Sequence, residues 1–401
     1  MTETAGVEHG VVLSATELRG SAATADWSRW VSRGKAPSHD PGITIFEQSW
    51  PLDFKQLADM GADSVYLTIE WARLEPRQNH YDEAEIDHVR NLLAGAKQYG
   101  LTTWAVLVDG TLPGWFSEDE HGFADSRSRG LLWPRHVDWV GETFGDLVDG
   151  WIPQREPVHH ALRSQLWALA PPGRSNPNRA GEAIRDTLLA EGEAWRLLAG
   201  TAPVATYQTV RSIVGTANDV KAERVARQLR AMSTESWVGA LTTGVISVPG
   251  AIERSAPHLR DAFDRVIVEL RPPIMVDASW SISPYPSEAV VGPTGLAPWP
   301  PASEENLRWV ADRLEGRAII AAGSLADVTD DGRSRPDYVE TMMGIAKQAA
   351  STTNVVGWCW SSAIDGYHWE HGHRIRPGLV TADRQPTSAA DSFRALARRS
   401  D

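Results

Sequence analysis

Short runs rich in valine, isoleucine and leucine alternate along this chain with longer amphipathic segments. Such alternation is typical of βα units, in which a buried strand of a parallel sheet is followed by a helix that covers it. Strands are expected at residues 20–25, 65–70, 103–109, 150–155, 203–208, 265–270, 318–321 and 356–360. Eight such units close into a ring, so we predict an α/β protein with the (β/α)8 fold, a TIM barrel.

Helical periodicity fills the intervals between these strands. One helix is predicted after an N-cap at Asp82, and another after Ser303, because apolar residues then recur on one face. The predicted apolar faces are Ile86, Val89, Leu93 and Ala96 in the first helix, and Leu307, Val310, Ala311 and Leu314 in the second. The final segment, 386–399, is expected to be an amphipathic helix that packs outside the barrel through Phe393 and Leu396.

The 401 residues suit either one large barrel or two ordinary domains. The stretches richest in proline and glycine, 171–177 and 284–301, lie inside the alternation. They are therefore interpreted as long loops after the fourth and sixth strands, at the face where barrel active sites form. We predict a single-domain barrel over residues 1–401.

Composition excludes several classes of partner. The formal charge of -13 argues against nucleic acid, which normally binds a basic surface. No apolar stretch approaches the roughly 20 residues that span a bilayer, and residues 1–8 carry acids without an apolar core, so no membrane partner and a cytoplasmic location are expected. The lone cysteine, Cys359, is expected to be a buried structural thiol without a redox role. The 18 tryptophans would suit a cleft for a sugar or another flat ligand.

Several segments match, in order, the patterns of one enzyme family. Residues 64–76 are similar to the family's second strand, usually Tyr-Arg-Phe-Ser-Ile-Ser-Trp-x-Arg-x-x-Pro. Residues 144–157 end in Arg-Glu-Pro, where its fourth strand ends in Asn-Glu-Pro, and residues 170–173 resemble the Ala-Pro-Gly that follows. Residues 357–369 match Trp-Ser-Leu-x-Asp-Asn-x-Glu-Trp, and Gly378-Leu379-Val380 continues the pattern. Together these ordered matches resemble glycoside hydrolase family 1.

The resemblance implies cleavage of β-glycosides by two glutamates, one acid/base and one nucleophile. Glu156 matches the acid/base, and an apolar cleft would raise its pKa enough to keep it protonated near neutrality. The family's nucleophile, in Thr-Glu-Asn-Gly, matches Ala321. The arginine and tyrosine that hold this nucleophile match Tyr66 and Leu270, so the carboxylate and both partners are replaced together. Ordinary retaining hydrolysis is therefore not expected.

Positions that bind sugar in the family have changed as well. The first-strand glutamine matches Ser28, and the asparagine before the acid matches Arg155. A histidine–tryptophan pair after the third strand matches Asp109-Gly110, and a late hydroxyl-binding glutamate matches His368. Two sugar-contacting tryptophans remain, Trp360 and Trp369. The residues predicted to contact a ligand are Ser28, Tyr66, Arg155, Trp360, His368 and Trp369.

Three acidic residues are candidates to replace the lost carboxylate: Asp109, Glu70 and Glu269. Each follows or ends a predicted strand and could act as a base for water, although a salt-bridged structural role is the more common use of such a residue. Arg155 beside Glu156 would lower the pKa of that acid and favour a role as base or anchor. We name Glu156, Asp109 and Glu269 as the candidate catalytic residues.

A metal or cofactor site is not expected. His368, Glu370, His371 and His373 cluster in the sequence, but their spacing fits none of the zinc patterns. No phosphate-binding loop or nucleotide fingerprint is present.

Three hypotheses for function follow. The first is a divergent family-1-like enzyme that uses Glu156 as general acid/base on a small glycoside or other compact metabolite. The second is an ordinary β-glycosidase, which would require a different match at Ala321. The third is a barrel that binds a small ligand without catalysis. The remodelled positions are polar, which favours a new activity, because an abandoned pocket would fill with apolar side chains.

Overall fold

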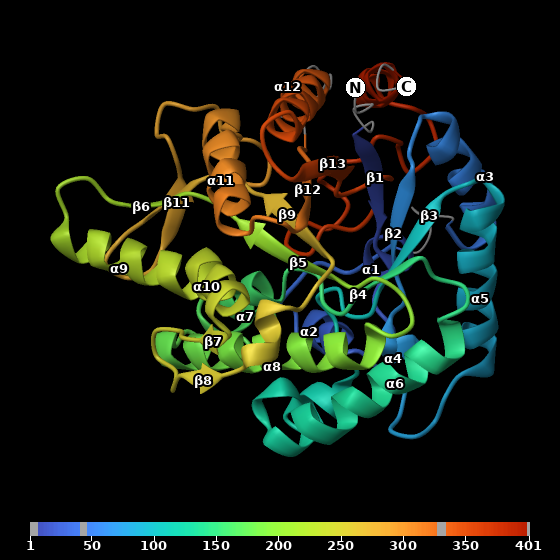
Figure 1. Ribbon diagram of the computed structural model, residues 1–401, viewed down its shortest axis with the longest axis horizontal. Helices are drawn as coiled ribbons and strands as arrows, with labels where there is room; N and C mark the ends of the chain where they lie inside the picture. Colours follow the sequence, from blue (N-terminus) through green and yellow to red (C-terminus); the bar gives the residue numbers. More distant parts are fainter. Residues whose placement is uncertain (1–6, 41–45, 327–333, 399–401) are drawn as a thin grey trace.

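The computed structural model describes residues 7–40, 46–326 and 334–398. Parallel strands form one eight-stranded sheet in the order β4-β3-β2-β1-β13-β12-β9-β5 (Figure 1). Its strands are β1 (Glu8–Leu13), β2 (Ser64–Thr68), β3 (Thr102–Val106), β4 (Gly150–Ile152), β5 (Ala205–Val210), β9 (Arg265–Leu270), β12 (Ala318–Gly323) and β13 (Val355–Trp360). The sheet order follows the chain order, so the predicted (β/α)8 barrel is confirmed.

The two edges of the sheet meet and close the ring. Isolated parallel bridges join Trp151 to Val204 and Arg155 to Tyr207, across the gap between β4 and β5. The second bridge lies beyond the end of β4, so it also fixes the backbone next to Glu156. A closed sheet leaves few unpaired backbone groups at this edge.

Helices cover the outside of the barrel (Figure 1). They are α1 (Ala15–Arg19), α2 (Asp26–Ser32), α3 (Phe46–Asp59), α4 (Trp71–Leu74), α5 (Glu83–Gln98), α6 (Trp133–Phe144), α7 (Pro157–Gln165), α8 (Pro177–Leu198), α9 (Val220–Arg230), α10 (Ser236–Thr243), α11 (Pro300–Arg313), α12 (Ser334–Ala350) and α13 (Ser388–Ala397). A small sheet of β6 (Ile213–Gly215), β10 (Ile274–Val276) and β11 (Ile282–Pro284) extends beside α9, and β7 (Val245–Ile246) pairs with β8 (Arg254–Ser255). Within the described ranges, no helix combines the length and apolar character needed to cross a bilayer.

Alternation along the strands separates the core into two layers. Inward-facing side chains fill the barrel with a compact cluster that includes Tyr66, Trp104, Tyr207 and Cys359. Outward-facing side chains, such as Trp358, pack against the helices in a much larger cluster. The prediction of a buried Cys359 is confirmed.

The prediction of the first strand was wrong. Residues 20–25 lie between α1 and α2 as a partly buried loop, and the strand is β1, which pairs with both β2 and β13. The apolar run Val11-Val12-Leu13 is short and follows two charged or polar residues, Glu8 and His9, so it gave a weak pattern. Its burial on both faces is nevertheless typical of a parallel strand.

The helix predictions were mostly confirmed. Asp82 caps α5, and its side chain accepts a hydrogen bond from the Glu85 N–H. α13 packs with Phe393 buried, as expected for the last segment. The start of α11 was placed too late, because the helix begins at Pro300, after Trp299, rather than after Ser303. Proline is favoured in a first helical turn, where its missing N–H costs nothing.

A buried carboxyl group on α8 makes the stability of the barrel sensitive to pH. Glu191 accepts hydrogen bonds from Thr206 Oγ1 at 2.8 Å and from Gln208 Nε2 at 3.0 Å. Burial raises the pKa of Glu191 from 4.5 to about 8, although these hydrogen bonds oppose the change. The stabilising contribution of this neutral carboxyl group is complete below pH 4.5 and is lost as the pH rises toward 8.

Replacement of Glu191 by glutamine is therefore expected to remove this dependence. Between pH 4.5 and about 8, the free energy of unfolding of E191Q should rise relative to wild type by about 1.4 kcal/mol per pH unit. Urea unfolding of both proteins at several pH values measures the difference. E305Q, on the exposed face of α11, is the matched control and should stay parallel to wild type. Parallel curves for E191Q would show that Glu191 ionises normally.

Candidate active site

A cavity of about 390 Å³ lies at the carboxyl ends of the barrel strands. Its volume is within the range of small-molecule sites, and this face is where barrel enzymes carry their chemistry. Ionisable side chains, most of them from strand ends, line it. They are Asp109 after β3, Arg155 and Glu156 after β4, Arg211 after β5, Glu269 in β9 with Arg271 beyond it, and Glu17 from α1.

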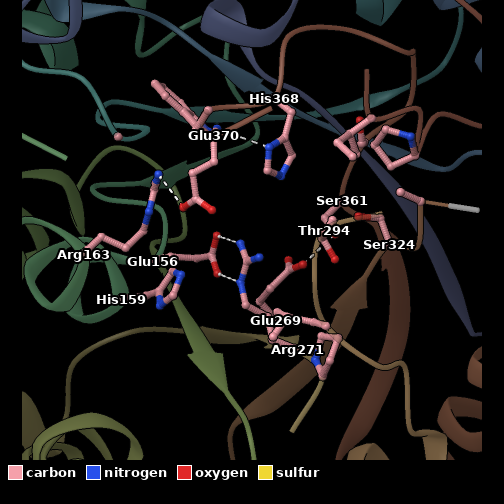
Figure 2. Close-up of a pocket in the computed structure, with 18 of the residues that line it drawn as sticks. Glu156, His159, Arg163, Glu269, Arg271, Thr294, Ser324, Ser361, His368 and Glu370 are labelled. Carbon is pink, nitrogen blue, oxygen red and sulfur yellow. Dashed lines mark hydrogen bonds and ion pairs between the residues drawn. The ribbon is translucent and has the colours of Figure 1, made fainter. Parts of the chain in front are cut away.

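Glu156 is held by an arginine that lies far away in the sequence. Arg271 Nε donates to Glu156 Oε1 at 2.7 Å and its Nη2 donates to Oε2 at 2.6 Å (Figure 2). The Thr209 hydroxyl also donates to Oε1. The backbone of Glu156 has φ 51° and ψ 43°, a left-handed conformation that is strained for a residue with a side chain. Pro157 follows and starts α7, and a proline disfavours the right-handed helical conformation in the residue before it.

The predicted protonation of Glu156 is corrected by this pairing. Burial acts to raise its pKa, but Arg271 outweighs burial, through its charge and its hydrogen bonds, and brings the pKa below 4.5. Glu156 is therefore ionised at neutral pH. Arg155, which the sequence suggested as the cation that lowers this pKa, pairs with Asp109 and contributes less than Arg271.

Glu269 lies on the other side of the Arg271 guanidinium in the same cavity (Figure 2). Its Oε2 accepts a hydrogen bond from the Tyr207 hydroxyl at 2.6 Å, and its Oε1 accepts one from Ser361 Oγ at 2.7 Å. Two hydroxyl donors fix the carboxylate without neutralising it. This side chain is thus a buried, oriented carboxylate that faces a cavity.

Asp109, unlike Glu269, pairs with an arginine. Arg155 Nη1 lies 3.4 Å from both of its carboxylate oxygens, and Thr68 Oγ1 donates to it at 3.1 Å. Arg155 also donates to the Ser361 carbonyl and lies over the Tyr207 ring, at 5.4 Å from its centroid. Asp109 and Arg155 thus form an ion pair at the base of the cavity.

Glu17 is a pocket carboxyl group that the sequence did not single out. It follows β1 in α1 and lines the cavity. Burial raises its pKa to about 8, with Arg155 opposing the rise and Asp109 adding to it. Glu17 is consequently neutral near pH 7 and can donate a proton.

The loop after β13 supplies His368, Trp369 and Glu370 to the opposite wall of the cavity. Glu370 lies 3.1 Å from Arg163 of α7, and its backbone N–H donates to His368 Nδ1 (Figure 2). Burial, followed by the neighbouring His371, lowers the pKa of His368 to about 3, so its ring is neutral. Among the residues that the structure describes, no group of three His, Cys, Asp or Glu side chains is arranged to hold a metal ion.

Three predicted ligand contacts lie elsewhere. Tyr66 belongs to the interior of the barrel, because it stands two residues before the end of β2 and thus below the cavity. Trp360 points outward from β13, is fully buried and donates to the Pro377 carbonyl. Ser28 lies on α2, where its hydroxyl donates to the Ala22 carbonyl at 2.8 Å. The error at Ser28 follows from the wrong placement of the first strand.

Two other positions named from the sequence also face away from the cavity. Ala321 packs in the outer layer, in register with Val268 and Trp358, whereas Ala322 faces the barrel interior, in register with Glu269. Glu70 binds Arg73 at 2.8 Å and does not line the cavity. Residues 318–326 hold no Asp or Glu, so this strand and its end contribute no carboxylate to the cavity at either alanine.

The cavity residues that the sequence analysis missed all lie shortly after the end of a barrel strand. Arg211 and Arg271 are the first residues after β5 and β9, and Glu17 follows shortly after β1. Residues at strand ends reach the active-site face of a barrel, so the boundaries of β5 and β9 would have identified the two arginines.

A closed (β/α)8 barrel with a polar cavity at the carboxyl ends of its strands has the architecture of a barrel enzyme. The family model for glycosyl hydrolase family 1 matches residues 26–237, more than half of the chain. The chain belongs to this family.

Relatives and solved structures agree with this assignment. A β-glucosidase of Agrobacterium sp. (strain ATCC 21400) is 28% identical over 186 residues, which span 45% of this chain and 40% of that protein. Beta-glucosidase 12 of Arabidopsis thaliana is 20% identical over 407 residues, covering 86% of this chain and 80% of the relative. The structure of a β-glycosidase from Pyrococcus horikoshii superposes with a TM-score of 0.86 at 20% identity, over 100% of this chain and 95% of that one. A β-glucosidase from Exiguobacterium marinum gives 0.87 at 16%, over 100% and 99%.

Proposed function

We propose that this chain is a glycosidase that cleaves a small glycoside, with Glu156 and Glu269 as its pair of carboxylates. The relatives named β-glucosidases support a glycoside as the ligand. The observation that carries the proposal is that two buried carboxylates, from the ends of β4 and β9, line one cavity. Glycoside hydrolysis of this type requires two such groups.

Glu269 is assigned the role of the second carboxylate, because β12 carries no Asp or Glu. It stands in register with Ala322, on the strand next to β12, and two hydroxyl groups orient it. Asp109 is less available, because the Arg155 guanidinium faces both of its oxygens. As nucleophile, Glu269 would give retention at the anomeric carbon; as base for water, it would give inversion.

Glu156 is assigned the role of general acid/base. In the pair with Arg271 it is ionised, so it can accept a proton from water but can donate one to a leaving oxygen only after Arg271 moves away. Glu17 is a second source of this proton, because its carboxyl group is neutral near pH 7.

Two alternatives have support of their own. The Arg271–Glu156 ion pair favours a barrel that binds ligand without catalysis, because it removes a proton donor. The family match and the names of the relatives support an ordinary retaining β-glycosidase equally well. That alternative differs from the proposal if the nucleophile is a carboxylate other than Glu269, also outside residues 318–326.

Chromophore release from a panel of aryl β-glycosides tests the proposal. Wild type is expected to hydrolyse at least one substrate, and E156Q to do so more slowly, by roughly 10²- to 10⁴-fold, the usual contribution of a general acid or base. E305Q, at an exposed position on α11, is the control for the same chemical change and should match wild type.

The other outcomes separate the alternatives. Equal rates for wild type and E156Q would remove Glu156 from the mechanism. Binding of glycosides without turnover by wild type would favour the non-catalytic barrel. A 2-deoxy-2-fluoro glycoside traps a covalent intermediate in retaining enzymes, and mass spectrometry of the labelled peptide would identify Glu269 or another residue as the nucleophile.

A further inference from the structure

Two arginines enter the cavity side by side from neighbouring strands. Arg211 and Arg271 directly follow β5 and β9, whose last residues, Val210 and Leu270, are paired in register. The Arg271 N–H donates to the Val210 carbonyl at 3.1 Å, which extends the pairing to the arginines themselves. Inward-facing residues alternate along these strands, so both side chains project toward the cavity, which they line.

Within the described part of the chain, Arg271 has a counterion and Arg211 has none. Arg271 binds Glu156 with two hydrogen bonds. The other pocket arginines are also paired, Arg155 with Asp109 and Arg163 with Glu370. In residues 7–40, 46–326 and 334–398, no hydrogen bond or ion pair joins the Arg211 guanidinium to another side chain, and its Nε is buried without a partner.

Burial of the Arg211 guanidinium in the cavity costs free energy, because none of the described residues forms an ion pair with it. Burial, and then the charge of Arg271, lower the pKa of Arg211 to about 9, although the more distant charges of Glu156 and Glu370 oppose the change, so the guanidinium keeps its proton at neutral pH. A partly buried charge without a partner is normally neutralised by a partner or a ligand. The planar fork of arginine matches the two oxygens of a carboxylate or phosphate.

We propose that the cavity binds a ligand carrying one anionic group, a carboxylate or a phosphate, which pairs with Arg211 beside the Glu156–Arg271 ion pair. The substrate class is then an anionic glycoside, a statement that rests on the proposed function. The anion site itself does not depend on catalysis. An extended polyanion does not fit, because the chain carries a formal charge of -13 and the arginine lies inside a cavity.

Calorimetric titration with ligands that cannot be hydrolysed tests the proposal. The probes are phenyl 1-thio-β-D-glucoside, its 4-carboxyphenyl analogue, benzoate and inorganic phosphate, at constant ionic strength. Wild type is expected to bind the carboxyphenyl thioglucoside about ten- to one-hundred-fold more tightly than the phenyl compound, the usual effect of a charged hydrogen bond. R211Q should bind both equally.

Two variants control the experiment. R254Q makes the same change at an exposed position on β8 and should keep the wild-type preference. R211K keeps the charge but loses the fork, so it should retain only part of the preference. Since no group of the described residues pairs with Arg211, the thermal unfolding midpoint of R211Q should not fall below that of wild type, which separates loss of binding from loss of fold.

The possible results distinguish the anion site from the glycoside function. No preference for the carboxylate in wild type, or an equal preference in R211Q, overturns the anion site. Binding of benzoate or phosphate that depends on Arg211, without binding of either thioglucoside, supports the anion site and contradicts the glycoside function. The ratio of benzoate to phosphate affinity shows which anion the site prefers.

Discussion

Glu269→Gln is expected to reduce kcat for aryl β-glycosides by roughly 10³- to 10⁶-fold, the loss seen when a nucleophile or essential base is removed. The amide keeps the size of the side chain and can still accept from Tyr207 or Ser361. It cannot attack an anomeric carbon or take a proton from water. KM should change little, because the substitution affects the chemical step.

The controls for this result lie in the same cavity and on the surface. D109N removes the other candidate carboxylate and should cost less, because Asp109 already pairs with Arg155. E305Q should retain full activity. A larger loss in D109N than in E269Q would transfer the assignment to Asp109. Nuclear magnetic resonance of the first anomer released shows whether the reaction retains or inverts configuration.

Arg271→Met is expected to destabilise the protein by about 3 kcal/mol at pH 7, because it leaves the carboxylate of Glu156 buried without its counterion. This value lies at the low end for a buried pair, since 32% of the Arg271 side chain is exposed to solvent while 11% of Glu156 is. Urea unfolding measures the loss. E156Q/R271M should lose less than the sum of the single changes, because it removes both charges.

The loss should also depend on pH. In wild type, Arg271 holds the pKa of Glu156 below 4.5, so the pair contributes stability above pH 4.5 that is lost as the pH falls through the lowered pKa. Without Arg271, burial raises this pKa instead, and ionisation then destabilises the fold as the pH rises. The difference between wild type and R271M should therefore widen from pH 4 to pH 7. A difference that stays constant would show that Arg271 acts through packing alone.

Most of the barrel could be predicted because its strands are continuous apolar runs. Arg265–Leu270 was predicted with its bounds as observed, since the apolar run Val266-Ile267-Val268 is typical of a buried strand. β1 was missed because only Val11-Val12-Leu13 marks it and the preceding residues are polar or glycine. Its recognition depends on pairing with β2 and β13, which lie far along the chain.

The site could be predicted only in part, for a physical reason. Motifs identified Glu156, Asp109 and Glu269 as residues at strand ends, and all three line the cavity. The partner of Glu156 could not be predicted, because Arg271 is 115 residues away and reaches it only through the register of β5 and β9. The same long-range charge reverses the direction in which burial alone would move the pKa of Glu156.

The packed interior of the barrel determines how a ligand can enter and leave the cavity. Tyr66, Trp104 and Tyr207 are buried together in the barrel interior, below the cavity, so in the part of the chain that the structure describes the centre of the ring is packed with side chains. A molecule must enter and leave by one mouth, so whichever part is inserted first departs last. The fragment bound deepest will compete with the next molecule for the same space, so accumulated product is expected to slow turnover.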